Sequence, residues 1–285
     1  MKTENLGENK ILNKRSAGKK ICSVILILYT FISLYLLLST LMNSFKTKKD
    51  LINNTLGFPK SFTLDNFKRL LLEEGYLRYF SNSIILVMMG LFLLILCASL
   101  AAYGIAQYNF KGKGLLQTYF MVGLMFPIQL GILPLFIMLT RAHLNNTLFG
   151  LALVYAANLS FPLFVFTNFF KSLPPAVIES ARIDGASEFK IFARIVFPIA
   201  KPVFFTMGII NFVSIWNDFF LPLVFLTKKS VRTLTLSIYS YTCNFLQNWS
   251  VIFAAVTVAL IPIIVIYFVF SNQIVAGLTG GSVKE

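Results

Sequence analysis

The chain has 285 residues, of which 57% are hydrophobic and only 13% are charged. Soluble domains carry roughly 25% charged residues, so this composition excludes an ordinary soluble protein and indicates an integral membrane protein. The formal net charge is +14, but the basic residues gather at the ends of apolar runs, which predicts contact with membrane lipid and no binding of nucleic acid.

Six apolar stretches follow a polar, basic segment at residues 1–20. The first, residues 21–45, carries no charge and is longer than the roughly 7–15 apolar residues of a signal peptide, so we expect a retained membrane span. The other expected spans cover residues 84–105, 115–139, 148–170, 203–226 and 251–270. We therefore predict an all-α, polytopic membrane protein with six transmembrane helices, a cytoplasmic segment at 1–20 and one transmembrane domain at 21–285.

Several of these spans contain prolines. Pro127 and Pro134 fall in the third expected span, Pro162 in the fourth, Pro222 in the fifth and Pro262 in the sixth. A proline inside a helix removes a backbone hydrogen bond and kinks the helix, which membrane helices tolerate where neighbours or water satisfy the freed carbonyls. We expect kinks at these positions.

A polar segment, residues 171–202, separates the fourth and fifth expected spans. Pro174 and Pro175 suit the first turn of a helix, so we expect a short helix over about 176–183. Asp184-Gly185 then favours a stop, because glycine accepts the left-handed backbone that caps a helix. Apolar residues at helical spacing after this turn predict a second, amphipathic helix that ends at Pro198.

The amino-acid sequence of this segment is more informative than its expected secondary structure. It resembles the EAA loop of bacterial ABC-importer permease subunits at Glu179, Ala181, Asp184, Gly185 and Ala186, and then at Ile195-x-Phe197-Pro198. Ser180 and Phe197 stand where alanine and leucine are commonest, and each keeps the size class of the side chain. In that family the loop is cytoplasmic, and its first helix docks into a cleft of an ATP-hydrolysing subunit.

The resemblance implies an ABC importer type I permease fold and a set of residues that meet the ATPase subunit, namely Glu179, Ala181, Arg182, Asp184, Gly185 and Ala186. It also implies a transport subunit that is not an enzyme and holds no cofactor or metal, since ATP and Mg²⁺ bind to partner subunits. No Gly-x-x-x-x-Gly-Lys-Ser/Thr sequence occurs in the chain, as expected if a partner hydrolyses the ATP. The implied partners are a second homologous permease, two ATPase subunits and an extracytoplasmic sugar-binding protein.

Other stretches resemble carbohydrate permeases of the maltose-importer class. They are residues 58–67, Asn82-Ser83, Trp216–Phe219 and the tail at 277–284. In that class the C-terminal tail can reach the interface between ATPase subunits. The resemblance implies that this chain forms half of the translocation pathway for a sugar, most simply a di- or oligosaccharide.

Six spans would place both termini and the 171–202 loop on one side of the membrane. That side holds 14 Lys and Arg residues and the other side holds 11. The rule that basic residues favour the cytoplasmic side therefore favours cytoplasmic termini and loop, by a small margin. The expected location is the bacterial plasma membrane.

Asp218 is the one ionisable residue deep in an apolar run. Such residues are costly in a membrane and commonly line a pathway or bind a partner. Asn211, Trp216, Asn217 and Asp218 are therefore the candidate pathway residues. The alternative is a structural role, in which Asp218 pairs with Lys228 or with a neighbouring subunit.

Two other solute classes and two other modes of action compete with this hypothesis. A permease of the same loop family can carry glycerol-phosphate or peptide. A stand-alone secondary transporter should show an internal repeat or several intramembrane charges, and the sequence shows one such charge and no convincing repeat. A membrane-embedded enzyme needs paired acid/base or metal-binding groups within the spans, and the sequence shows none.

Overall fold

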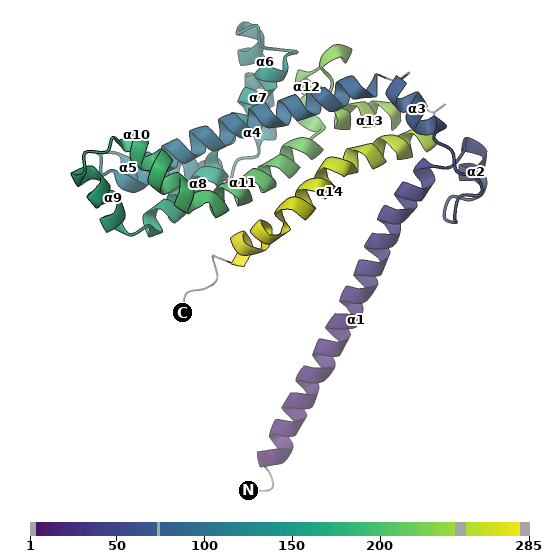
Figure 1. The fold of residues 1–285 in the computed structure, drawn as a ribbon, viewed down its shortest axis with the longest axis horizontal. Coiled ribbons are helices and arrows are strands. Elements are labelled where there is room, and N and C mark those ends of the chain that lie inside the picture. The colour runs from purple at the N-terminus through teal and green to yellow at the C-terminus, as the bar shows by residue number, and fades with distance from the viewer. Residues whose placement is uncertain (1–3, 73–74, 243–248, 280–285) are drawn as a thin grey trace. The chain divides into compact units, whose positions relative to one another are not determined.

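A computed structural model describes residues 4–72, 75–242 and 249–279, and these residues form helices joined by turns (Figure 1). The chain divides into two compact units, one of residues 1–73 and 246–258 and one of residues 74–245 and 259–285. The last residues of the C-terminal tail, 280–285, lie outside the described residues.

The first unit holds helices α1 (Glu4–Ser44), α2 (Lys48–Asn53) and α3 (Asp65–Leu72), and the start of α14 (Trp249–Thr279). The turn after α1 is tied down by Lys46, whose side chain is fully buried. Its Nζ donates hydrogen bonds to the carbonyl oxygens of Asn54 at 2.6 Å, Thr55 at 3.3 Å and Gly57 at 2.7 Å. These bonds provide a donor for three carbonyl groups that lie outside the helices and accept no intrahelical hydrogen bond.

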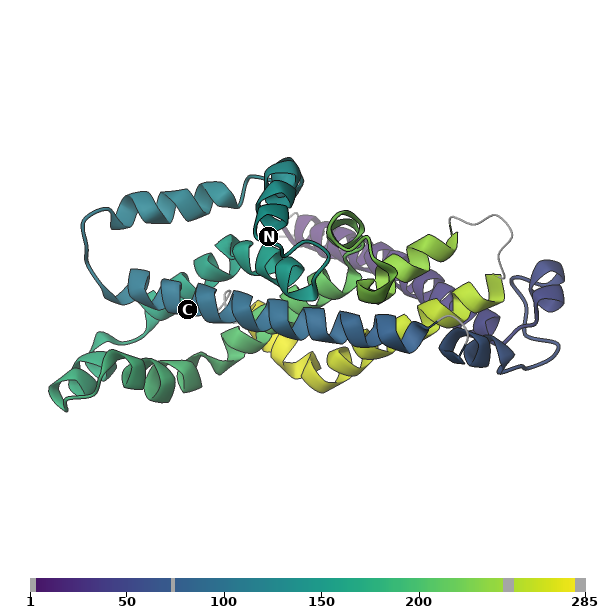
Figure 2. The ribbon, with the colours of Figure 1, turned by 90° about the horizontal axis from the view of Figure 1, so that it is seen from above.

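The second unit holds the remaining elements. They are α4 (Tyr76–Gln107), α5 (Lys113–Gly123), η1 (Ile128–Gly131), α6 (Ile132–Arg141), α7 (Leu148–Ala157), α8 (Ser160–Ser172), α9 (Pro175–Ile183), α10 (Glu188–Ile191), η2 (Phe192–Val196), α11 (Phe197–Asn217), α12 (Phe220–Phe225), η3 (Lys229–Val231), α13 (Leu234–Thr242) and α14 from Ala259 onward. Helix α4 packs against α7, α8 and α11, and both ribbon views show it running beside α11 (Figures 1 and 2).

Small residues let other helices approach α4 closely. Its buried positions include Gly90, Leu94, Ala98 and Ala102, which recur every four residues and so lie on one face. A Cβ added at Gly90 would touch the Tyr155 side chain at 3.4 Å. Because lipid is as apolar as a side chain, helices in a membrane associate through this kind of close packing.

By length and composition, four of the described helices can cross a membrane, and the number rises to six if each of two bent pairs is one span. One pair joins α5 to the η1–α6 segment with a bend of 97°, and the other joins α7 to α8 with a bend of 50°. The predicted all-helical membrane fold is confirmed, and six spans are reached only with both bent pairs counted in this way.

Two of the five prolines in the expected spans coincide with these bends, whereas Pro222 lies in the first turn of α12 and α14 continues through Pro262. Pro127 is the N-cap of η1, in the break of the first pair, and Pro162 lies in the first turn of α8, just after the break of the second. Pro134 instead lies in the first turn of α6, which it does not interrupt. A proline in a first turn removes no intrahelical bond, because that N–H has no partner in any helix.

The expectation that Pro198 ends a helix is wrong. The chain remains helical from Glu188 to Asn217, through the π-helical segment η2 and then α11, with Pro198 in the first turn of α11. A π turn is wider than an α turn, and this gives the proline ring room that a regular helix lacks. The candidate fifth span therefore begins earlier than residue 203, and it breaks at Asp218 rather than continuing to 226.

Candidate functional site

Helix α9 is a short, well-capped helix. Pro174 is its N-cap and Pro175 its first residue, as the two prolines predicted. At the other end Gly185 has a φ of +74°. The Gly185 N–H donates to the Arg182 carbonyl and the Ala186 N–H to the Ala181 carbonyl, both at 3.0 Å. This pair of bonds is the Schellman motif, so the predicted glycine stop is confirmed.

One face of α9 is buried in the permease itself and the other is exposed. Ile178 and Ala181 are 2% and 8% exposed, whereas Ile183, at the end of the helix, is 86% exposed. Glu179, Asp184 and Gly185 are also exposed, and Ala186 is half-buried. Of the six predicted docking residues, Ala181 is thus the one whose side chain this chain already covers.

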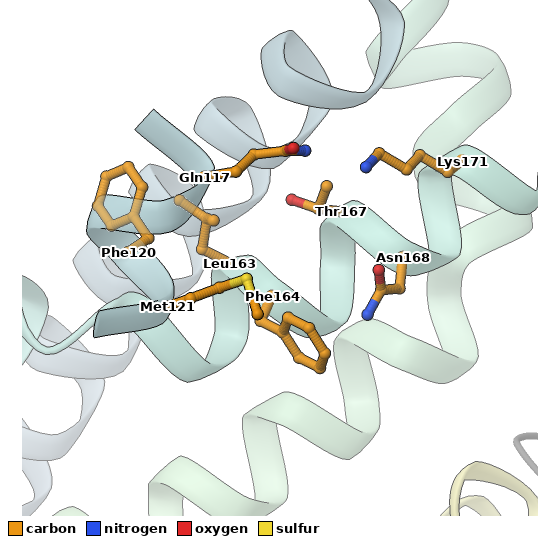
Figure 3. A pocket seen from close by; sticks show the side chains of 8 residues that line it. All are labelled: Gln117, Phe120, Met121, Leu163, Phe164, Thr167, Asn168 and Lys171. Atoms are coloured by element: carbon orange, nitrogen blue, oxygen red, sulfur yellow. The ribbon is translucent and has the colours of Figure 1, made fainter. Parts of the chain in front are cut away.

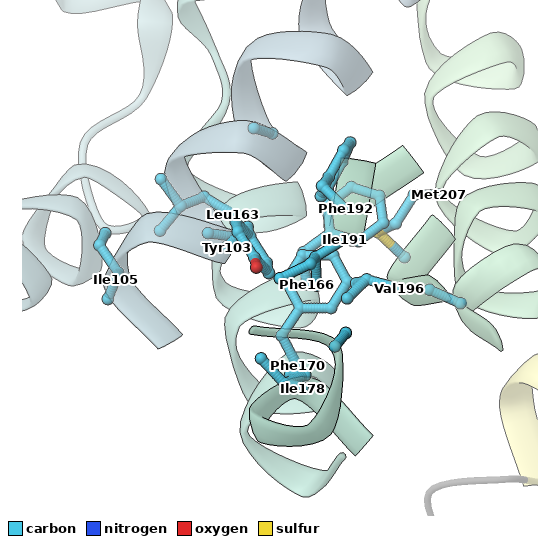
Figure 4. Packing of buried hydrophobic residues seen from close by; sticks show 14 residues of the cluster. Tyr103, Ile105, Leu163, Phe166, Phe170, Ile178, Ile191, Phe192, Val196 and Met207 are labelled. Atoms are coloured by element: carbon cyan, nitrogen blue, oxygen red, sulfur yellow. The ribbon is translucent and has the colours of Figure 1, made fainter. Parts of the chain in front are cut away.

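The buried face of α9 joins a cluster of apolar side chains at the ends of α4 and α8 (Figure 4). Phe166 and Phe170 of α8 are fully buried and stack at 5.8 Å between ring centroids. Ile191, Phe192 and Val196 enter the same cluster from α10 and η2. The loop is therefore packed onto the membrane helices along its length and is not attached only at its two ends.

A charged pair crosses the loop above this cluster. The Arg182 Nε donates to Glu188 Oε1 at 2.8 Å, and its Nη2 lies 3.4 Å from Glu188 Oε2. The Tyr103 hydroxyl of α4 donates to Glu188 Oε2 at 2.8 Å, and the Arg182 guanidinium lies 5.6 Å from the centroid of the Tyr108 ring. The hydrogen bond to Glu188 raises the pKa of Arg182 above its ordinary value. The sequence indicated Arg182 but not Glu188, because nothing in the spacing shows that the two side chains meet.

Asp218 lies at the break between α11 and α12. Its Oδ1 accepts hydrogen bonds from the backbone N–H groups of Phe220 at 2.8 Å and Leu221 at 3.3 Å. Its Oδ2 accepts a hydrogen bond from the Tyr155 hydroxyl of α7 at 2.8 Å. The carboxylate therefore has partners inside this chain other than the suggested Lys228, whose backbone N–H binds the Asn146 side chain.

Asp218 also lines a cavity of about 320 Å³. Its polar lining comes from Gln129, Tyr155, Asn158, Ser214 and Asn217 in addition to Asp218. A larger, mostly apolar groove of about 730 Å³ begins beside it and shares Ile128 and Asn158. Amide, hydroxyl and carboxylate groups beside an aromatic ring suit a polyhydroxylated ligand. Gln129, Tyr155 and Asn158 lie far from Asp218 in sequence, so only the fold brings them to it.

The four predicted pathway residues do not all face this cavity. Asn217 and Asp218 line it. Trp216 is 3% exposed and its Nε1 donates to the Ala259 carbonyl at 3.1 Å, so it packs α11 against α14. Asn211 donates its Nδ2 to the Met207 carbonyl at 2.8 Å, one turn back in α11, and is not part of the cavity lining.

A third, smaller cavity of about 100 Å³ lies between α5 and α8. Gln117, Thr167 and Lys171 point toward one another across it (Figure 3). The Thr167 hydroxyl is buried and has no hydrogen-bond partner among the described residues. Throughout the residues that the structure describes, no group of three His, Cys, Asp or Glu side chains is placed to hold a metal ion.

The family follows from comparison with known proteins. A family model described as "Binding-protein-dependent transport system inner membrane component" matches residues 94–279. The chain belongs to this family. The permease is thus a multi-pass inner-membrane component of an ABC transport system and not an enzyme, and the predicted family is confirmed.

Curated relatives resemble this permease over most of its length. The diacetylchitobiose uptake system permease protein NgcG of Streptomyces coelicolor is 33% identical, covering 93% of this chain and 88% of the relative. The multiple sugar-binding transport system permease protein MsmG of Streptococcus mutans is 35% identical, covering 87% of this chain and 91% of the relative.

A solved structure has the same fold. It is a bacterial ABC transporter involved in the import of the acidic polysaccharide alginate, and one of its chains matches the permease with a TM-score of 0.79 at 20% identity. The match covers 88% of this chain and 94% of that one. The predicted ABC-importer permease fold is therefore confirmed.

Proposed function

We propose that this permease forms half of the pathway by which a di- or oligosaccharide enters the cell, and that a separate ATPase drives it through α9. The single observation that carries the proposal is the two-faced packing of α9. One face is buried in the permease core, while Glu179, Ile183, Asp184 and Gly185 remain exposed around a rigid cap. A helix held in this way can transmit a displacement from a partner subunit to the membrane helices.

The exposed part of α9 has the chemistry of a docking surface. Ile183 offers an apolar contact, and Glu179 and Asp184 offer charges that orient a partner. Apart from its chain neighbours, no atom of the described residues lies within 4 Å of a Cβ built on Gly185. A partner's backbone can therefore approach closely at the end of the helix. Phe189, which is 75% exposed on α10, extends the same apolar contact.

The sugar assignment rests on the relatives and on the cavity at Asp218. Two relatives are named for the uptake of diacetylchitobiose and of multiple sugars. The Asn158 and Asn217 amides and the Ser214 hydroxyl, which line this cavity, offer donors and acceptors of the kind that sugars use. Asn217 and Asp218 are the pathway residues of this proposal, whereas Trp216 supports α11 and Asn211 stays a prediction.

The remaining parts of the assembly belong to the same proposal. We expect a second homologous permease, two ATPase subunits and an extracytoplasmic sugar-binding protein, with both termini and the 171–202 loop in the cytoplasm. One solved relative of this fold is an alginate ABC transporter in complex with an alginate pentasaccharide-bound periplasmic protein, matched at a TM-score of 0.62. That structure supplies the precedent for the expected binding protein.

Cysteine cross-linking in the assembled importer tests the docking face. Cys22, Cys97 and Cys243 are replaced by serine, and Ile183→Cys is compared with Leu72→Cys, which is 81% exposed on α3. We expect a cross-link to the ATPase from position 183 and none from position 72, which six spans place on the other side. A position 183 that reacts with a membrane-impermeant reagent from outside, or that never cross-links in an active importer, would overturn the proposal.

Reconstitution into liposomes tests the substrate. We expect uptake of short oligosaccharides that requires both ATP and the binding protein. Uptake of glycerol-phosphate or a peptide in place of sugar would keep the docking mechanism and overturn the sugar assignment. Uptake by the permease alone would instead indicate a secondary transporter.

A further inference from the structure

Glu188 is bonded to two different parts of the permease. One carboxylate oxygen accepts from the Arg182 Nε of α9 at 2.8 Å, and the other accepts from the Tyr103 hydroxyl of α4 at 2.8 Å. The Arg182 guanidinium also lies over the Tyr108 ring, just after the end of α4. These three bonded side chains, Arg182, Glu188 and Tyr103, are called the loop clamp below.

The loop clamp spans a boundary between exposed and buried surface. The Arg182 and Glu188 side chains are each more than one third exposed, at 36% and 40%. Tyr103 is only 6% exposed, and its ring packs against Phe170 at 6.2 Å and Phe192 at 5.4 Å between centroids. Hydrogen bonds to a charged group are stronger than those between neutral groups. The buried tyrosine therefore holds the carboxylate, and the carboxylate holds the arginine of α9.

Helix α4 is also fixed at its far end. The Asn82 Nδ2 donates to the carbonyls of Ser230 at 3.0 Å and Arg232 at 2.9 Å, and the Ser83 Oγ accepts from the Leu234 N–H at 2.8 Å. With 32 residues, α4 is about 48 Å long at 1.5 Å per residue. One rigid helix thus joins the clamp to the segment around residues 230–234.

We propose that the loop clamp makes α4 a second lever for the docking helix, beside the direct chain connection through α10 to α11. Arg182, Glu188 and Tyr103 are positioning residues. They keep α9 at a fixed angle to α4, so that a displacement of α9 moves α4 and α11 together. Without the clamp, α9 tilts on its apolar seat and part of the displacement is lost. This inference rests on the proposed function, because it needs a partner that moves α9.

The variants are chosen to open the clamp with minimal change of packing. Tyr103→Phe keeps the buried ring and removes only the hydroxyl. Glu188→Gln keeps the shape and removes the charge. Lys190→Gln is the matched control, since Lys190 is exposed on the same α10 and belongs to no clamp bond. The double variant Arg182→Glu with Glu188→Arg restores an ion pair in reversed order.

Hydrogen exchange of the amides in α9 is measured on the purified importer complex, so no substrate is needed. We expect exchange in residues 176–183 to speed up about fivefold in Tyr103→Phe and Glu188→Gln, the scale of one net hydrogen bond. Lys190→Gln should match the wild type, and the reversed pair should recover part of the protection. Equal exchange in the wild type, Tyr103→Phe and Glu188→Gln would overturn the proposal.

A coupling measurement separates a positioning role from a merely structural one. ATP hydrolysis with magnesium ATP and uptake of diacetylchitobiose, the sugar in the name of one relative, are measured on the same liposomes. We expect the clamp variants to assemble normally and to transport about fivefold less sugar per ATP. If the wild type couples ATP hydrolysis to sugar uptake and the clamp variants transport as much sugar per ATP as it does, the lever is overturned. A wild type whose position 183 never meets the ATPase would instead overturn the proposed function.

Discussion

Gly185→Asp is expected to leave the permease folded and assembled while separating ATP hydrolysis from uptake. Gly185 has a φ of +74°, and a Cβ built on it meets no described residue other than its chain neighbours within 4 Å. The Cβ of a new side chain therefore has open space among the described residues of the permease. Its cost to folding comes from the left-handed backbone alone, and its cost to function comes from whatever partner occupies that space.

The backbone cost can be bounded. An ordinary residue in the left-handed region costs roughly 1–2 kcal/mol, and Asp and Asn are among the residues that tolerate it best. Gly185→Asp and Gly185→Asn should therefore have nearly equal stability, because they share size and backbone preference and differ by one charge. Gly112 is a matched control, since it has a φ of +89°, is equally open, and lies in another loop.

The assay compares Gly185→Asp, Gly185→Asn and Gly112→Asp for melting temperature, co-purification with the ATPase, ATP hydrolysis and uptake. We expect all three to assemble, and only the two Gly185 variants to lose most of their uptake while hydrolysis continues. A larger loss for Asp than for Asn would indicate an acidic partner surface. Wild-type uptake by Gly185→Asp, or an equal loss in Gly112→Asp, would show that no partner packs closely against Gly185.

Other substitutions test polar side chains that are buried, as Lys46 and Thr167 are, or half-buried, as Asp218 is. Asp218→Ala removes the oxygen that accepts from two backbone N–H groups, whereas Asp218→Asn keeps one such oxygen. Hydrogen bonds to a charged group contribute about 1.5–3 kcal/mol, so Asp218→Ala should lower the melting temperature more than Asp218→Asn. Equal melting temperatures would contradict the capping role. Lys46→Met leaves three carbonyls without their donor and should speed chymotrypsin cleavage after Phe58, whereas the exposed Lys48→Met should not. Thr167→Val removes a buried hydroxyl without a partner among the described residues and should be neutral or stabilising by up to about 1 kcal/mol; a clear loss of stability would mean that a molecule outside this chain binds the hydroxyl.

The break between α11 and α12 is stabilised both by local hydrogen bonds and by packing against another helix. Asp218 ends α11, and its carboxylate then accepts the first N–H groups of α12, so the break leaves few unpaired backbone groups. The bonded Tyr155 ties this break to α7. An acid that a hydropathy plot marks as costly is thus compensated on three sides. Its remaining free surface faces the cavity, which allows a structural and a pathway role in one residue.

The local features of the docking loop were predictable because they depend on a few neighbouring residues. Two prolines start α9, and a glycine that accepts positive φ ends it, whatever surrounds the helix. The prediction failed at Pro198, where the rule that proline ends a helix assumes a regular α turn before it. The π turn of η2 precedes Pro198 instead, and no short-range pattern in the sequence indicated it.

Apolar runs, prolines and glycines are local features, so the amino-acid sequence alone indicated a helical membrane protein with a short capped helix at 175–185, and the resemblance of residues 179–198 to the EAA loop implied the ABC-importer family. Three features became visible only once the helices were packed: the free face of α9, the burial of Trp216, and the position of Glu188 between Arg182 and Tyr103, the latter 85 residues away from Glu188 in the chain. The physical reason is that exposure and pairing depend on where distant segments come to lie. Side chains far apart in sequence meet only after the helices have packed.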